Sequence, residues 1–166
     1  MNYFELFEIP PQFEVDTKKL KPKFLELSRK FHPDFNTNED ETGLQRVMEI
    51  SSAVNKGWQV FQDPMATLQY VLEMTGSISE QENATLSGDF LMEMMELNES
   101  WMDAETPEAK NQIIDQISSL KQEIYDPIKN YLEADKVADI PQEGMLQIKD
   151  YYYKKKYLDR ILEDFH

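Results

Sequence analysis

The sequence lacks cysteine and has only two histidines in its 166 residues. Without cysteine the chain can form neither a disulfide nor a thiolate metal site. His32 and His166 are too few for a histidine-rich metal site. We therefore expect a protein that works without a metal or other cofactor.

Long apolar runs and an excess of basic residues are missing too. No run approaches the ~18 apolar residues of a membrane span, and an acidic residue, Glu5, near the start is unlike a signal peptide. The net charge of −15 disfavours nucleic acid and anionic membranes as partners. The simplest interpretation is a cytoplasmic protein with no nucleic-acid or membrane partner.

Strand-like alternation, internal repeats and low-complexity tracts are also absent, whereas apolar residues recur at helical spacing. The predicted fold class is all-α. We expect helices near residues 2–7, 18–31, 41–62, 64–74, 88–103, 107–134 and 141–165. Pro22 should kink the first turns of the second helix or delay its start to about Leu20, and Pro127 should interrupt the sixth.

The chain divides at a polar stretch that opens with Gly76. We expect a first unit over residues 1–76, a linker over 77–88 and a three-helix bundle over 89–166. Residues 1–38 carry as many basic as acidic side chains, so the remaining residues supply the whole net charge. The basic second helix is therefore a local exception in an acidic protein.

The tripeptide His32-Pro33-Asp34 is the most informative motif. Before it, Leu20, Phe24, Leu27 and Phe31 form one apolar helix face, while the rest of that helix surface is mostly Lys and Arg. Pro33 should end the helix by about His32, which leaves the tripeptide exposed at a helix C-terminus. Such a position between two helices suits docking better than catalysis.

At these residues the chain resembles a J domain, the helical hairpin that stimulates ATP hydrolysis by DnaK-type chaperones. The resemblance extends to Met1–Phe7, Val54–Gln59, Asp63–Pro64 and Tyr70–Leu72. It implies a chaperone-binding surface made of His32, Pro33, Asp34, Lys19, Lys23, Arg29 and Lys30. The basic side chains would steer the helix to an acidic surface of the ATPase unit. Gly57, where alanine is usual, and Phe35, where a basic residue is common, depart from the pattern.

The helix from about Phe90 has more apolar residues than one buried face needs. Phe90, Met94, Leu97 and Trp101 form the natural core stripe, and a second patch of Leu and Met with acidic edges lies ~110° away. This patch either packs on the first unit or binds a partner, and the residues alone give these about even odds.

Residues 90–97 resemble the scaffold-binding segment of the HscB family, the J proteins of iron–sulfur cluster assembly. The resemblance implies an L-shaped bacterial co-chaperone that delivers an IscU-like scaffold protein to an HscA/DnaK-type ATPase chaperone. It assigns scaffold binding to Leu91, Met92, Met95, Glu96, Glu99 and Tyr157. The spacing of the last helix separately allows Tyr157 to be exposed.

Three other interpretations remain. His32 and Asp34 have the residue types of an acid–base pair, but no nucleophile, phosphate loop or orienting group accompanies them, so we expect no enzyme. A J protein serving a different client would keep the chaperone contact and not bind the scaffold. A purely structural helical adaptor would affect no ATPase.

Overall fold

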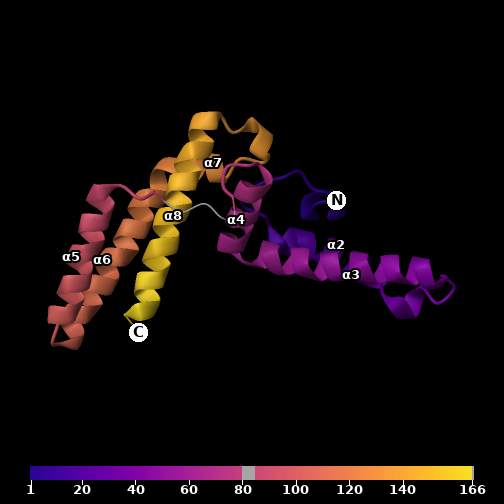
Figure 1. The fold of residues 1–166 in the computed structure, drawn as a ribbon, viewed down its shortest axis with the longest axis horizontal. Helices are drawn as coiled ribbons and strands as arrows, with labels where there is room; N and C mark the ends of the chain where they lie inside the picture. Colours follow the sequence, from indigo (N-terminus) through magenta and orange to yellow (C-terminus); the bar gives the residue numbers. More distant parts are fainter. Residues whose placement is uncertain (80–84, 166) are drawn as a thin grey trace. The chain divides into compact units, whose positions relative to one another are not determined.

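The computed structural model describes residues 1–79 and 85–165, and every regular element in these ranges is a helix (Figure 1). The all-α prediction is confirmed. Residues 80–84 of the expected linker lie outside the described residues. No helix in the described ranges is long and apolar enough to span a bilayer.

The chain forms two compact units, Met1–Met74 with Glu133–Ile140, and Thr75–Leu132 with Pro141–His166. This division differs from the expected one at residues 133–140, which we placed in the C-terminal bundle. They belong to the first unit, where the Val137 amide donates to the Pro11 carbonyl at 2.8 Å. A tertiary contact of this kind leaves no periodic signal in the sequence.

The first unit contains α1 (Tyr3–Leu6), α2 (Thr17–Lys30), α3 (Glu41–Gln62) and α4 (Pro64–Met74). The helices α2 and α3 pack side by side as a hairpin. Phe4, Phe7, Leu27, Val54 and Phe61 are nearly fully buried in the core of this unit. The hairpin thereby fixes the ends of α2 and α3, between which the His-Pro-Asp tripeptide lies.

The start of α2 corrects one expectation. The helix begins at Thr17 despite Pro22. The carboxylate of Asp16 accepts hydrogen bonds from the amides of Lys18 (3.1 Å) and Lys19 (3.3 Å), which are otherwise without partners in a first helical turn. This N-cap starts the helix, and Pro22 removes only one later backbone bond. The predicted delayed start is wrong.

Gly57 is buried on α3 where the side chain of Tyr3 packs. A Cβ atom at Gly57 would lie 3.0 Å from Cγ of Tyr3 and 3.2 Å from the ring of Phe7. Tyr3 is held in place, because its amide donates to the Tyr70 hydroxyl at 2.9 Å and the two rings stack at 4.7 Å. The departure from alanine at this position therefore has a packing reason.

The second unit contains α5 (Gly88–Asp103), α6 (Pro107–Tyr125), the 3-10 turn η2 (Asp126–Ile128), α7 (Lys129–Leu132) and α8 (Gln142–Asp164). Pro127 interrupts the helix as expected, so the predicted 107–134 helix is divided into α6, η2 and α7. The core combines α5, α6 and α8: Phe90, Met94, Leu97, Ile113, Ile117, Leu158, Ile161 and Phe165. Trp101 packs against this core, and its ring stacks on that of Phe165 with 4.3 Å between the ring centroids.

Candidate functional site

The tripeptide forms a defined turn. The helix α2 ends at Lys30, and Pro33–Phe35 form the short 3-10 helix η1 before the loop to α3. His32 caps η1, because its Nδ1 atom accepts a hydrogen bond from the Asp34 amide at 3.1 Å. Pro33 occupies the first position of η1, where its fixed φ is suitable and its missing N–H has no cost. The turn is thus specified by the tripeptide itself.

A residue outside the tripeptide ties this turn to the end of α2. The side-chain amide of Asn36 donates to the carbonyl of Lys30 at 3.0 Å and to that of His32 at 2.8 Å. The Lys30 carbonyl is among those that a helix end leaves without a helical partner, whereas the His32 carbonyl also accepts from the Phe35 amide at 3.0 Å. The sequence analysis missed Asn36, although an Asn shortly after a helix end is a known turn signal.

The carboxylate of Asp34 is available to a partner, since 86% of the side chain is exposed. The His32 imidazole lies beside it, with its Nδ1 atom 3.7 Å from the carboxylate. The turn therefore presents one negative charge on a fixed backbone, which is suited to pairing with a cation. His32 lies 6.0 Å from the ring of Phe35, which is itself 70% exposed.

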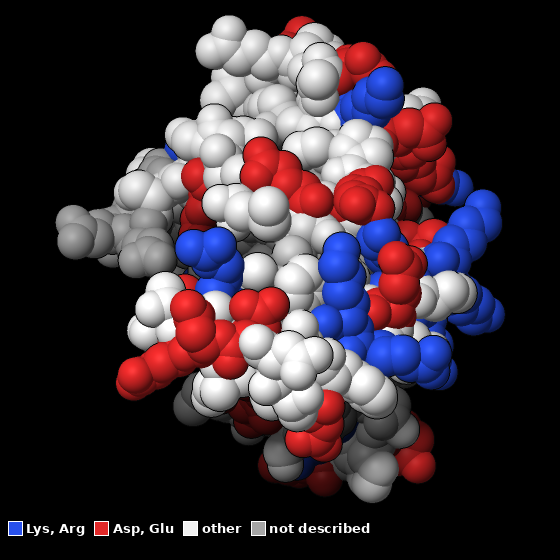
Figure 2. All heavy atoms as spheres, turned by 90° about the vertical axis from the view of Figure 1, so that its right-hand side faces the viewer, with Lys and Arg blue, Asp and Glu red and all other residues white. Residues whose placement is uncertain are grey.

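The basic side chains of α2 are not equivalent. Lys23 pairs with Glu8 and lies 3.7 Å from Glu26. The hydrogen bond from Lys23 lowers the pKa of Glu8 and raises that of Lys23. Lys19 and Arg29 are exposed and have no ion pair among the described residues. Figure 2, which views the molecule from the right-hand side of Figure 1, shows Lys and Arg gathered at one side of that view, with acidic side chains nearby.

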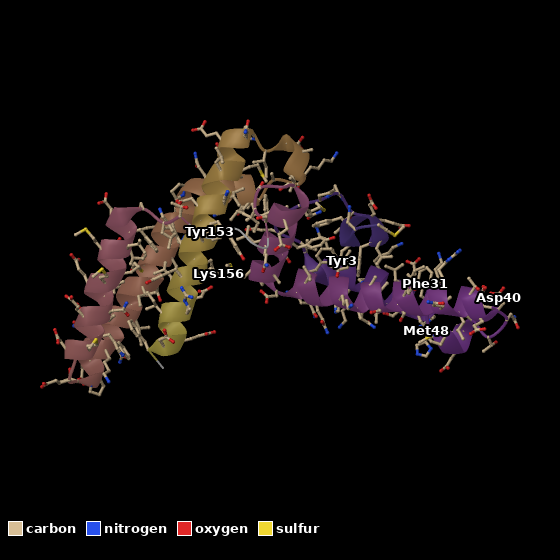
Figure 3. The ribbon with its side chains drawn as sticks, viewed as in Figure 1. Tyr3, Phe31, Asp40, Met48, Tyr153 and Lys156 are labelled. Atoms are coloured by element: carbon tan, nitrogen blue, oxygen red, sulfur yellow. The ribbon has the colours of Figure 1, made fainter. Side chains whose placement is uncertain are left out.

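The sequence analysis also missed a shallow groove of about 490 Å³ beside the turn. Pro33 and Met48 line it, together with polar residues of α3. Met48 is 55% exposed and, like Asp40, lies near the end of α3 that is close to the turn (Figure 3). Met48 is next to Val47, which recurs with Val54 and Phe61 at helical spacing, so this periodicity could have marked Met48 as a residue off the buried face.

The residues expected to bind the scaffold lie on α5. Leu91, Met92 and Met95 are 38%, 62% and 63% exposed, whereas Met94 on the same helix is fully buried. Glu96 and Glu99 are exposed as well. We call these five exposed residues the α5 surface. Flexible Met side chains suit an interface that must adapt to its partner.

Tyr157 of α8 is half-buried beside the first turn of α5. Its ring meets that of Phe90 edge-on at 6.0 Å, and the Arg160 guanidinium lies over its other surface at 5.2 Å. Phe90 directly precedes Leu91 of the α5 surface. The structure therefore places Tyr157 in contact with the helix whose outer face carries the other predicted scaffold-binding residues.

The described residues contain no group of three or more His, Asp or Glu placed to hold a metal ion. The Asp34 carboxylate and the apolar side chains of the α5 surface are exposed to a partner. Both surfaces have the features of protein docking sites, a charged turn and an apolar helix face.

Comparisons with known proteins agree with this interpretation. Residues 86–166 match a family described as "HSCB C-terminal oligomerisation domain". The chain is 31% identical over 171 residues to the "Co-chaperone protein HscB homolog" of Shewanella oneidensis, which covers 99% of this chain and 94% of that protein. A homolog from Vibrio cholerae is 38% identical over 100 residues, 60% of this chain and 58% of that protein.

Solved structures show the same likeness. The structure is similar to human co-chaperone protein HscB with a TM-score of 0.77 and 27% identity, over 99% of this chain and 80% of that one. It is similar to the chaperone HscB from Vibrio cholerae with a TM-score of 0.71 and 26% identity, over 99% and 95% of the two chains. The chain therefore belongs to the HscB family of co-chaperones.

Proposed function

We propose that this protein stimulates ATP hydrolysis by an HscA/DnaK-type chaperone through the His32-Pro33-Asp34 turn and delivers an IscU-like iron–sulfur scaffold protein to it through the α5 surface. It would thereby assist the maturation of iron–sulfur proteins. The observation that carries this proposal is the presence of both docking surfaces, the exposed Asp34 carboxylate and the exposed Leu91, Met92 and Met95, in one HscB-family chain. We propose the bacterial cytoplasm as the place of this function, which the bacterial origin of two similar proteins supports.

In this mechanism the basic face of α2 steers the protein to an acidic surface of the ATPase unit, which mainly raises the association rate. Asp34 then pairs with a basic group of the chaperone, competing with the interaction that this group makes in the resting state. The turn is fixed beforehand by His32, Pro33 and Asn36, so little entropy is lost when it docks. The co-chaperone adds no catalytic group to the ATP site, and the stimulation is allosteric.

The α5 surface would bring the scaffold protein into the same complex. Its apolar side chains supply buried area, and Glu96 and Glu99 at its edge would favour a partner with basic residues around an apolar centre. Tyr157 supports this surface through Phe90. The iron–sulfur cluster is cargo of the scaffold, and the co-chaperone needs no ligand for it.

Steady-state ATP hydrolysis by the chaperone tests the proposal, measured with this protein alone, with the scaffold alone and with both. We expect stimulation by the protein and a more than additive effect with the scaffold. Asp34→Asn should abolish stimulation while circular dichroism and thermal melting stay unchanged, because the side chain is 86% exposed. Stimulation without synergy would point to another client. No stimulation at all would leave a structural adaptor and overturn the proposal.

A further inference from the structure

A second hollow lies on the α-helical bundle, between the C-terminal end of α6 with η2 and the first half of α8. It is an open groove of about 500 Å³, within the usual range of binding sites. The helices α6 and α8 run side by side in Figure 1, and η2 continues α6 beyond its end. The groove, here called the α6–α8 groove, shares no residue with the α5 surface or with Tyr157.

The floor and one wall of the groove are apolar. Ile128 and Tyr151 are 3% and 7% exposed, and they are fixed in the bundle core beneath it. Leu146 lines the groove from α8. Its side chain is 60% exposed, more than that of any other leucine among the described residues. Pro127 and Ile124 complete the apolar lining. An apolar side chain of a partner would remove Leu146 from water without any rearrangement of the floor.

Hydrogen-bond acceptors surround this apolar centre. Glu123, Glu143 and Asp150 line the groove and are exposed. Lys154 is the one cation among the described residues that line it, and Asp150 already pairs with it at 2.9 Å. Glu123 and Glu143 have no ion pair among the described residues. The groove is therefore negative around an apolar centre.

The break in the helix adds a further acceptor. Pro127 has no backbone N–H, so the carbonyl of Glu123, four residues earlier, lacks its usual helical donor. Glu123 and Pro127 both line the groove, so the interrupted bond lies on this face of the helix. A donor-rich side chain such as Arg or Lys can satisfy both the carbonyl and the carboxylate of Glu123.

We propose that the α6–α8 groove docks a partner segment that carries one bulky apolar side chain next to Lys or Arg residues. The apolar side chain rests against Leu146 and Ile128, and the basic ones pair with Glu123 and Glu143. Charge complementarity selects this occupant, because an acidic segment would meet three carboxylates and a neutral one would leave Glu123 and Glu143 without an ion pair. The groove is thus a second docking site on the bundle.

Fluorescence anisotropy with the full chain tests this proposal. The probe is a labelled Gly/Ser peptide with a central Leu-Arg-Lys, and matched probes carry Ser-Arg-Lys or Leu-Glu-Glu instead. We expect binding of the first probe alone, with weaker binding at high salt. Leu146→Ser should weaken binding about ten-fold or more, as loss of a buried apolar anchor does. Glu143→Gln should weaken it about three-fold, as loss of one exposed charge pair does.

Leu25→Ser is the matched control, since Leu25 is 54% exposed on α2, outside the groove, and should leave probe affinity unchanged. Amide NMR shifts on adding the probe should be largest around Leu146 and Glu123, and circular dichroism should show that each variant is folded. The proposal is overturned if the acidic probe binds equally or if the shifts fall elsewhere. It is also overturned if Leu146→Ser changes only sedimentation of the protein alone, which would show that the groove holds a second copy of the chain.

Discussion

The His32–Asp34 turn and the α5 surface present their side chains in different ways. The turn is held by short-range hydrogen bonds: His32 Nδ1 accepts from the Asp34 amide, the Asn36 side chain donates to two carbonyls, and the Phe35 amide donates to the His32 carbonyl. The side chains of the α5 surface make no such bonds with the part of the chain that the structure describes. Its Leu and Met side chains are the outer face of a helix whose inner face, with Met94 and Leu97, is buried.

This difference indicates what kind of partner each surface can recognise. A turn fixed before docking places one carboxylate accurately and loses little entropy, which suits a switch that depends on a single charge. Exposed Met side chains adjust to the shape of the partner and distribute the binding energy over several contacts. One substitution should therefore disable the turn, whereas the α5 surface should require several.

The largest expected effect separates the two surfaces. Replacing Leu91, Met92 and Met95 together by Ala should weaken scaffold binding about a hundred-fold, since truncating interface anchors costs about 1–2 kcal/mol each and such values are not strictly additive. Stimulation of the chaperone without scaffold should stay unchanged. Isothermal titration calorimetry measures the scaffold affinity, and the ATPase assay measures the stimulation.

Asp34→Asn is the reciprocal variant and should keep full scaffold affinity. Leu25→Ala, an exposed apolar truncation on α2, controls for a general loss of apolar surface. Unaltered scaffold affinity in the triple variant would remove the α5 surface from the proposal. Loss of both activities in either variant would show that the two surfaces are not separate.

A second prediction concerns what holds the turn. Asn36→Ala removes the two donors to the carbonyls of Lys30 and His32, so the turn should lose order. We expect stimulation to fall several-fold and the free energy of unfolding to decrease by about 0.5–1 kcal/mol, because both hydrogen bonds are exposed to solvent. Urea unfolding and the ATPase assay measure these effects. Asn38→Ala, an exposed residue of the same loop, should change neither; equal effects of the two variants would show that Asn36 has no special role.

A third prediction separates steering from contact on α2. Arg29→Ala and Lys23→Ala each remove one positive charge, so each should lower the association rate by about two- to three-fold at low salt. Only Arg29→Ala should raise the dissociation rate, because Lys23 is already engaged by Glu8 and Glu26. Surface plasmon resonance at two salt concentrations gives both rates. A faster dissociation with Lys23→Ala would mean that Lys23 leaves Glu8 to bind the chaperone.

Much of the fold could be predicted because local signals agree with the tertiary structure. Thr106 and Pro107 predict the start of α6, and the structure has Thr106 as the N-cap with Pro107 first in the helix. Pro33 predicts the end of α2, which the structure places at Lys30. The start of α6 and the end of α2 each depend on a few neighbouring residues, so both can be predicted from the sequence.

The errors come from interactions that outweigh a local rule. Asp16 starts α2 although Pro22 argues for a later start, because a cap satisfies two amides while proline removes one bond. Residues 133–140 join the first unit through contacts such as that of Val137 with Pro11, which no periodicity signals. The sequence marks Asn36 only as a turn residue, and the structure adds which carbonyls, those of Lys30 and His32, its side chain binds.

The smallest expected effect lies in the bundle, where charged side chains link α6 and α8. Lys121 and Lys155 both pair with Asp159. Partial burial by itself would raise the pKa of Asp159, but hydrogen bonds and charges of the two lysines hold it below its usual value. A carboxylate with a lowered pKa stabilises the fold above the pKa of the unfolded chain, ~3.9, and loses this contribution as the pH falls through the pKa of the folded state.

Asp159→Asn should therefore destabilise the protein at pH 7 by no more than about 1 kcal/mol, because solvent screens the ion pairs. The difference in urea midpoint between the variant and the wild type should shrink below about pH 4. A difference that stayed constant down to pH 2 would mean that Asp159 acts through packing and not through its charge, whereas Asp34 in the His32–Asp34 turn is expected to act through its charge alone.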